Sequence, residues 1–320
     1  MIDESVDAVR AGFDALCGDG AAAIVAREVV AVQGPDAGRY LQGQLSQDVI
    51  AMSAPSAWSF ILQPSGKVDA WFRVHRLADD DFRLEIEPGH GQALITRLRR
   101  FLLRTDASIS EPQTWSLLAR RWSSSVLRFD EEVPDALAGA PVGPGVAGLD
   151  ALLSVEPDAA ARSVDIDPVP SAALERYRIA HGVPAMGAEL TVDTIPGEAG
   201  AWAIDASVSF TKGCYTGQEL VARIDSRGGN VPRPIRLLTV SGATGGTGLD
   251  AGDCPAVGAE VRHDGTLVGM VTSSSPSLGV DHPALALGPL ARAVEIGSTV
   301  ELVDGRRRWS AVVTEPPAAG

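Results

Sequence analysis

One stretch of this sequence gathers residue types that could do chemistry. Residues 210–219 read Phe-Thr-Lys-Gly-Cys-Tyr-Thr-Gly-Gln-Glu. Lys212 stands two residues before Cys214, where an ammonium favours the thiolate, the reactive form of cysteine. Gly213 and Gly217 allow the backbone to turn tightly and to approach a ligand closely. The segment therefore predicts a reactive thiol on a tightly folded loop.

The end of the same segment supports two interpretations. Gln218 offers an amide that donates and accepts, and Glu219 offers a carboxylate, a pair that suits a flat heteroaromatic ligand. The alternative is structural. In that alternative the glycines open a helix over residues 216–224, and Cys214 is a small buried hydrophobic residue, as free cysteines often are.

Lysine is scarce in this chain. The 320 residues include 27 basic and 41 acidic side chains, for a formal net charge of −14, yet only Lys67 and Lys212 are lysines. A protein of this charge repels phosphate backbones, so we expect neither strong nucleic-acid binding nor non-specific binding to anionic membranes. All the other basic residues of the chain are arginines. We therefore expect that Lys212 is specifically required, so that Lys212→Arg impairs function, and that Lys67→Arg has a mild effect.

The cysteines predict free thiols. Cys17, Cys214 and Cys254 are widely spaced without a C-x-x-C pair, which provides neither a disulfide framework nor a full ligand set for a metal. The first residues are acidic where a secretory signal would be basic, and no run of ~18 uncharged apolar residues occurs. We therefore expect a cytoplasmic protein without a bound metal and without a membrane partner.

Several regular elements follow from hydrophobic periodicity. We expect helices over residues 6–16, 92–104 and 171–180, the last capped by Ser171, and strands over residues 22–32, 58–63, 68–77 and 82–87. On the second helix, Arg97, Arg99, Arg100 and Arg104 are expected on a solvated polar face. From residue 236 onward, short apolar runs between glycine-rich turns predict a small β-barrel. The expected domains are residues 1–232, with two sub-lobes, and residues 233–320.

The octapeptide from Lys212 to Glu219 matches, without a mismatch, the K-G-C-Y-x-G-Q-E signature of the YgfZ family, folate-binding proteins related to the T-protein of the glycine cleavage system. Further segments that resemble the family in order are Tyr40–Val49, Pro64–Val68, Arg178–Pro184, Ile195–Glu198 and a glycine-rich tail from Gly258 to Gly297. The resemblance implies an α+β, T-protein-like fold in which a folate-binding region and a C-terminal β-barrel close around a central pocket.

The resemblance also implies a function. It implies a protein that binds tetrahydrofolate or a folate derivative and supports iron–sulfur cluster assembly or repair and tRNA modification, with iron–sulfur proteins as partners. The implied reactive residues are Cys214 and Lys212. The implied folate-binding residues are Gly213, Tyr215, Gly217, Gln218, Glu219, Arg223, Arg178 and Glu198. Arginines such as Arg223 suit the glutamate tail of a folate, because a guanidinium binds carboxylates through two hydrogen bonds.

Two departures separate the chain from T-proteins. Ala70 and Trp71 stand where T-proteins have an Asp-Asp pair, and Ala180 stands where they have a glutamate that recognises the pterin ring. Without the carboxylate, proton transfer in an aminomethyl step lacks its acid or base. Aminomethyl transfer is therefore not expected, although two alternatives stay open: folate-dependent one-carbon transfer from a methylated or aminomethylated substrate, and a folate sensor or scaffold without catalysis.

Overall fold

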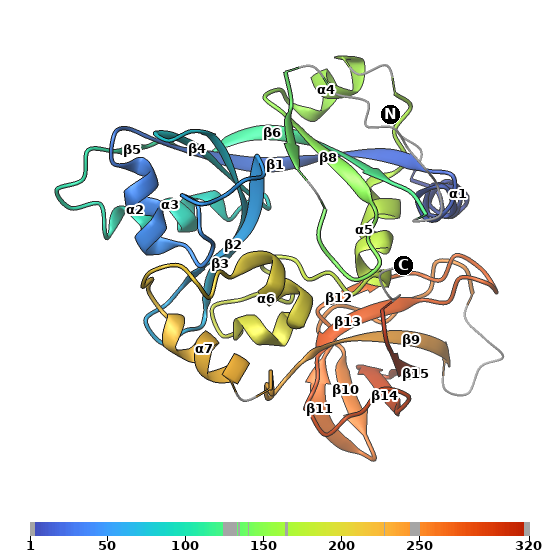
Figure 1. Cartoon of the computed structure of the whole chain (residues 1–320). Coiled ribbons are helices and arrows are strands. Elements are labelled where there is room, and N and C mark those ends of the chain that lie inside the picture. The colour runs from blue at the N-terminus through green and yellow to red at the C-terminus, as the bar shows by residue number, and fades with distance from the viewer. Residues whose placement is uncertain are drawn as a thin grey trace.

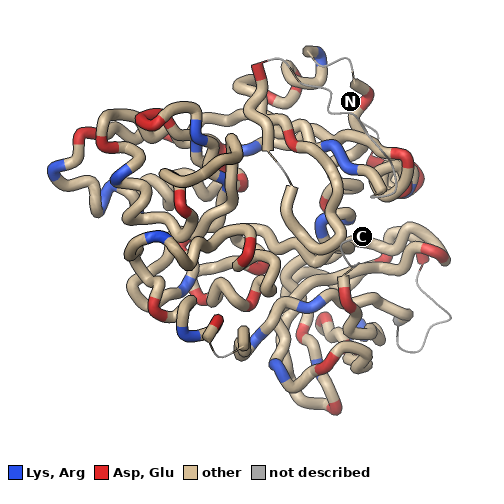
Figure 2. Tube along the Cα trace, in the orientation of Figure 1, with Lys and Arg blue, Asp and Glu red and all other residues tan. Residues whose placement is uncertain are grey.

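The computed structural model describes residues 4–123, 133, 135–139, 141–163, 166–226, 228–243 and 250–316. Two curled antiparallel sheets, joined by helical segments, form the molecule (Figure 1). Lysines and arginines are interspersed with acidic residues along the described chain (Figure 2). The predicted α+β class is confirmed.

Within the described residues, the first sheet has eight strands. Their order is β2-β3-β4-β1-β6-β8-β7, with β5 paired beside them to β1. The bounds are β1 Ala21–Gln33, β2 Ser56–Leu62, β3 Val68–Ala78, β4 Asp81–Ile86, β5 Ser108–Ile109, β6 Gln113–Arg121, β7 Leu137–Gly139 and β8 Gly148–Leu153. The four strands predicted from alternating or continuous apolar runs correspond to β1–β4. The aromatic side chains of Phe60, Trp71 and Phe72 are fully buried in its core.

Helices α2, α3 and α4 pack on strands of the first sheet, and α5 lies between the two sheets (Figure 1). Their bounds are α1 Val6–Cys17, α2 Ala37–Gln44, α3 Gly91–Arg99, α4 Pro157–Ser163, α5 Ser171–Ala180, the 3₁₀ turn η1 Pro196–Ala199, α6 Ala201–Ser207 and α7 Gln218–Ser226. Ser171 is the first helical residue of α5, and Pro170 holds the cap position without a side-chain hydrogen bond, so the predicted serine cap is wrong.

Helix α3 differs from its prediction in length and in one face. It ends at Arg99, five residues early, and Arg97 is buried rather than solvated. Its guanidinium contacts the Asp69 carboxylate through Nε at 2.8 Å and the Leu62 carbonyl oxygen through Nη2 at 3.0 Å. A buried arginine is stable there because its charge is paired and its donors have acceptors.

The second sheet comprises β9 Ile235–Ala243, β10 Glu260–His263, β11 Thr266–Met270, β12 Ser273–Ser275, β13 Leu285–Pro289, β14 Thr299–Asp304 and β15 Arg307–Thr314. Its order is β11-β10-β14-β15-β9-β13-β12. An isolated bridge between Gly269 and Leu290 brings its far strands together, and Trp309 is buried in its core. The strands therefore curl into the barrel-like shape predicted for the C-terminal part.

Helix α5 fixes the second sheet against the first. The Arg176 guanidinium is buried and donates to Ser275 Oγ at 3.1 Å and to the carbonyl oxygens of Pro276 and Pro283 at 2.8 and 2.9 Å. Arg178 Nη2 donates to Ser273 Oγ at 2.7 Å. These contacts hold α5 in a fixed position against the second sheet.

Candidate functional site

The segment from residue 210 to 219 forms a loop that leads into α7. Cys214 is exposed, so the alternative in which it is a buried hydrophobic residue is wrong. The helical part of that alternative is correct, because α7 begins at Gln218. The side-chain oxygen of Gln218 accepts a hydrogen bond from the Tyr215 amide at 3.2 Å, which closes the turn that enters the helix.

Lys212 anchors this loop to the C-terminal end of α2. Its Nζ donates to the carbonyl oxygens of Gln42, Leu45 and Gln47 at 2.7, 2.7 and 2.8 Å, at and just after the end of α2. An ammonium has three protons, so all of them are taken. Burial lowers the pKa of Lys212 to about 8, which leaves the group mostly charged at neutral pH.

The three hydrogen bonds of Lys212 give it a structural role, and its predicted effect on the Cys214 thiol stays a prediction.

Beside the loop lies a small cavity of about 230 Å³ lined in part by Lys212, Tyr215, Gln218 and Glu219. Burial raises the pKa of the Tyr215 phenol to about 12, so the hydroxyl keeps its proton. The predicted residue Arg223 is exposed in the last turn of α7.

Two segments that resemble the family separately form one unit in space. Gly66, in the turn between β2 and β3, and Gly217 both have positive φ, +82° and +80°. A Cβ on Gly217 would overlap the Gln63 carbonyl oxygen, and a Cβ on Gly66 would overlap Leu220. The turn and the start of α7 can approach this closely only through glycines. Gly213, in contrast, has open space around its Cα.

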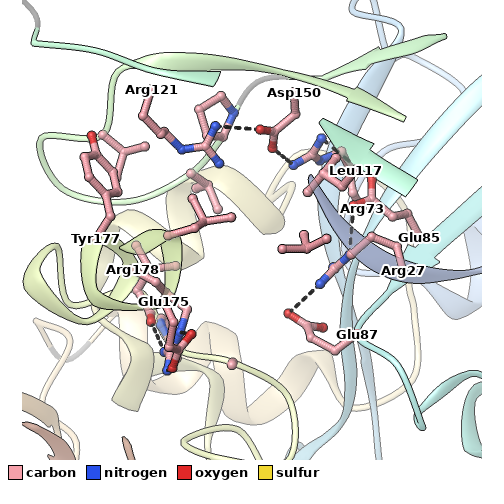
Figure 3. A pocket seen from close by; sticks show the side chains of 18 of the residues that line it. Arg27, Arg73, Glu85, Glu87, Leu117, Arg121, Asp150, Glu175, Tyr177 and Arg178 are labelled. Atoms are coloured by element: carbon pink, nitrogen blue, oxygen red, sulfur yellow. Dashed lines mark hydrogen bonds and ion pairs between the residues drawn. The ribbon is translucent and has the colours of Figure 1, made fainter. Parts of the chain in front are cut away.

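A second and larger cavity, of about 520 Å³, lies between the first sheet and α5 (Figure 3). It shares no lining residue with the small cavity. Of the ten predicted site residues, all of which the structure describes, Arg178 alone lines it. Volumes of this size are typical of small-molecule sites.

Paired charges form one wall of the large cavity. The Asp150 carboxylate, on β8, accepts a hydrogen bond from Arg73 Nη2. Its other oxygen accepts one from Arg121 Nη1 at 2.6 Å. Glu85, on β4, accepts from Arg27 Nε at 3.1 Å. Burial alone would raise the pKa of Glu85, but Arg73 and Arg27 hold it well below its usual range. Both carboxylates therefore stay ionised, and the wall is fixed by ion pairs.

Some polar atoms of the residues that line this cavity have no hydrogen-bond partner among the described residues. They are Arg73 Nε and Nη1, Trp58 Nε1 and Glu87 Oε2, all buried. Arg73 Nη1 forms an ion pair with Glu85 Oε2 at 3.6 Å, a distance too long for a hydrogen bond. The Trp58 ring stacks on Trp71 with centroids 4.3 Å apart. Three N–H donors and one carboxylate oxygen of the lining residues therefore lack a hydrogen-bond partner among the described residues.

Arg178 is held by protein contacts, whereas Glu198 is hydrogen-bonded through one carboxylate oxygen and its Oε1 has no hydrogen-bond partner among the described residues. Arg178 binds the carboxylates of Glu175 and Glu189, the latter through Nη1 at 3.2 Å. Glu198 Oε2 accepts from the Ile195 amide at 3.1 Å and so caps η1, and burial raises its pKa. Glu198 does not line the large cavity. The structure therefore places the predicted folate-binding residues at three separate locations.

The positions of the two departures from T-proteins can be located in the structure. Next to Ala70, Asp69 lies at a register irregularity of β3, and its carboxylate pairs with Arg97. Ala180 packs against the second-sheet cluster around Leu237 and Leu285 and does not line the large cavity. Neither position supplies a carboxylate to that cavity.

Sequence reasoning missed the large cavity's wall. The available signal was local: Arg27, Arg73 and Glu85 are charged residues inside stretches predicted as apolar strands. Charged residues are almost never fully buried unless they are paired, so their positions indicated a paired wall. Their partners could not be read from the sequence, because Arg73 and Asp150 are far apart along the chain.

Within the described residues, no group of three or more His, Cys, Asp or Glu side chains is placed to hold a metal ion. In the same residues, every helix is too short or too polar to cross a membrane.

Comparison with known proteins gives both sequence and structural relatives. No protein-family profile matches the chain. An iron–sulfur cluster assembly factor IBA57 homolog, mitochondrial, from Pyricularia oryzae is 26% identical over 218 residues, 65% of this chain and 54% of that protein. A tRNA-modifying protein YgfZ from Aliivibrio fischeri is 38% identical over 94 residues, 29% of this chain and 28% of that protein. The chain thus spans only about half the length of the IBA57 relative.

The crystal structure of glycine cleavage system aminomethyltransferase T from Bartonella henselae superposes with a TM-score of 0.73 at 20% identity. The match covers 98% of this chain and 91% of that one. The predicted T-protein-like fold is confirmed, and the resemblance to the YgfZ group is confirmed by its sequence relatives.

Proposed function

We propose that this chain, a relative of the YgfZ and IBA57 proteins with the T-protein fold, is a folate-binding accessory protein for iron–sulfur cluster assembly or repair and for tRNA modification. The observation that carries the proposal is Cys214, an exposed thiol on a loop that Lys212 fixes through three hydrogen bonds. An exposed thiol on a fixed loop is accessible to a partner protein.

The thiol acts together with a partner. Iron–sulfur clusters are commonly held by four cysteine ligands, and this chain has three cysteines on separate elements. Cys17 ends α1, and Cys254 packs against the core of the second sheet. Cys214 therefore supplies one ligand or one nucleophile, and an iron–sulfur protein supplies the others. Free thiols suit a reducing compartment, and we propose the cytoplasm.

The folate occupies the large cavity in this proposal. Arg73, Trp58 and Glu87 would hold its ring, since all three line that cavity and carry polar atoms without a hydrogen-bond partner among the described residues. A bound folate supplies a carrier for one-carbon groups. Aminomethyl transfer is not part of the proposal, because position 70 is an alanine and the neighbouring Asp69 is paired with Arg97.

Two measurements test the proposal. Calorimetric titration with tetrahydrofolate is expected to show binding to the wild type and to Cys214→Ala alike, because the thiol lies outside the large cavity. In a strain that lacks the protein, Cys214→Ala is expected to leave iron–sulfur enzyme activity low, whereas Cys17→Ala, the control at the other exposed cysteine, restores it. Full restoration by Cys214→Ala would show that the thiol has no role. Absence of tetrahydrofolate binding would remove folate from the account.

A further inference from the structure

A third cavity, of about 90 Å³, lies beside α7, the helix that follows the loop of Cys214. The turn η1 and residues of α6 and α7 line it, and we call it the α6–α7 cavity. Its walls are mainly apolar and comprise Ile195, Pro196, Ala201, Ile204, Val221 and Ile224. It shares no lining residue with the large cavity or with the small cavity beside Lys212. Different residues of α7 therefore line a cavity on each of two sides of this helix.

Two carboxylates lie among these apolar walls. Each helix contributes an Ile-Asp pair from its last turn, Ile204-Asp205 in α6 and Ile224-Asp225 in α7. Asp205 and Asp225 are exposed, and neither carboxylate has a hydrogen bond or an ion pair with another described residue. Arg223, on the same helix as Asp225, does not line the cavity. Among the described residues, the negative charge of the cavity therefore has no counterion.

The backbone adds to the preference for a cation. The C-terminal end of a helix carries partial negative charge, and the last turns of both α6 and α7 line the cavity. The end of α7 is fixed, because the Gly228 and Gly229 amides donate to the carbonyl oxygens of Asp225 and Ile224 at 3.0 Å each. The end of α6 is fixed by Ser46 Oγ, which donates to the Ser207 carbonyl oxygen at 2.6 Å. The cavity thus presents two carboxylates and two helix ends in a fixed arrangement.

The size and the walls of the cavity restrict its occupant. Small-molecule sites usually measure about 300–1,000 Å³, whereas about 90 Å³ is the share of roughly three water molecules in the liquid, so the cavity suits a single side chain. A calcium ion takes about six to eight oxygen ligands, which apolar walls do not supply. A lysine side chain fits both features, because its aliphatic stem packs against apolar walls while its ammonium meets the carboxylates.

We infer that the α6–α7 cavity receives a lysine side chain of the protein that meets Cys214, so that this partner docks across α7. The inference rests on the proposed function in one respect, namely that a protein partner reaches the thiol. The helix rises by only about 10 Å from Gln218 to Asp225, so one interface of ordinary size covers both the thiol loop and the cavity. The partner therefore presents a basic side chain beside its point of contact with Cys214.

Equilibrium disulfide exchange at Cys214 tests the inference with peptides as probes. Every sample is the full chain with Cys17→Ala, which removes the other exposed thiol. Short peptides contain one cysteine and one lysine at increasing spacings, and matched peptides carry norleucine, which keeps an aliphatic chain without the charge. Each peptide is supplied as its mixed disulfide with 2-mercaptoethanol, which the exchange releases, and free 2-mercaptoethanol is kept in excess. Intact mass then measures the fraction of protein joined to each peptide. At the best spacing, the lysine peptide is expected to form about fivefold more adduct than its norleucine match.

Four variants locate this preference. Asp205→Asn and Asp225→Asn should each lower it, and the double variant should remove it. Ala201→Leu narrows the cavity and keeps every charge, and it should also remove most of the preference, because the lysine stem no longer enters. Asp264→Asn, at an exposed turn of the second sheet, removes one distant negative charge and should keep the wild-type preference. Since Asp205 and Asp225 are exposed, their variants keep the inference testable even where Ala201→Leu does not fold.

The outcomes separate the inference from the proposed function. Equal adduct from lysine and norleucine peptides, or a preference that survives in the double variant, would overturn the inference. A preference that the asparagine variants remove but Ala201→Leu keeps would show that surface charge alone attracts the peptide, and it would also overturn the inference. Full restoration of iron–sulfur enzyme activity by Cys214→Ala would instead overturn the role of the thiol and leave the occupant of the cavity in place.

Discussion

The Lys212 loop holds a half-buried cation and the wall of the large cavity holds buried ones, and the two regions stabilise them in different ways. Lys212 is surrounded by neutral carbonyl oxygens, three of them within 2.8 Å, whereas Arg27, Arg73 and Arg121 are paired with ionised carboxylates. The first arrangement fixes a loop. The second leaves Arg73 Nε and Nη1 without a hydrogen-bond partner among the described residues. Charge thus fixes a loop in one region and, in our proposal, contributes to ligand recognition in the other.

The largest expected effect comes from the cavity wall. Asp150→Ala would leave Arg73 and Arg121 buried without their shared carboxylate, and we expect a loss of about 3–5 kcal/mol in the free energy of unfolding. Urea denaturation measures it. Glu301→Ala, which removes an exposed pair with Arg308, is the control and should change the free energy by less than about 1 kcal/mol. Similar losses in the two variants would show that the wall is not stabilised by this carboxylate.

Acid should weaken the same wall. The pKa of Glu85 in the folded protein lies below its ordinary value of 4.5, so below that pH the unfolded chain binds more protons. The contribution of Glu85 to stability is present above pH 4.5 and is lost as the pH falls, by on the order of 2 kcal/mol.

Unfolding free energies measured from about pH 6 down to about pH 3 test this dependence. Glu85→Gln should flatten the decline, and Glu111→Gln, at an exposed pair, should keep the wild-type slope. A wild-type slope in Glu85→Gln would mean that other groups cause the decline. Glu85 also contacts His75 Nε2 at 2.9 Å, so His75→Gln separates the contribution of the imidazole.

Two glycines of the Lys212 loop, Gly217 and Gly213, differ in how closely other backbone approaches them. Gly217→Ala forces a Cβ onto the Gln63 carbonyl at a positive φ, and we expect a loss of about 1.5 kcal/mol in unfolding free energy. Gly213→Ala adds a Cβ into open space and should stay within about 0.5 kcal/mol of the wild type. Thermal or urea unfolding distinguishes them, and equal effects would contradict the close approach of the turn to α7.

The smallest expected effect separates the two lysines. A planar guanidinium cannot direct donors at the three carbonyls around Lys212 as an ammonium does, so Lys212→Arg should cost about 1 kcal/mol and impair iron–sulfur support. Lys67 makes one exposed ion pair with Asp193 at 2.8 Å, and Lys67→Arg should be nearly neutral in both measurements. Equal effects would mean that the carbonyl site does not select lysine.

The sequence predicted what depends on local pattern. The strands β1–β4 and the helices α1 and α5 follow from apolar periodicity, and the loop before α7 was marked by its glycines and cysteine. Contacts between distant residues were not accessible. Arg97 was assigned to solvent because its partner, Asp69, is 28 residues away, and only the fold brings the two together.

The candidate site divides in the same way. Cys214 and Lys212 could be singled out by residue type, but the three carbonyls that bind Lys212 lie about 170 residues earlier in the chain. The roles of Glu87 and Trp58 could not be assigned, because a cavity formed by strands from across the first sheet has no signature in any one segment.

The central claim is that folate recognition and the reactive thiol occupy different regions of the molecule. Calorimetric titration of wild type, Cys214→Ala and Glu87→Gln with tetrahydrofolate tests it most directly. The account predicts wild-type affinity for Cys214→Ala and a loss of about tenfold or more for Glu87→Gln. Lost affinity in Cys214→Ala together with wild-type affinity in Glu87→Gln would contradict it and would move the folate to the Lys212 loop.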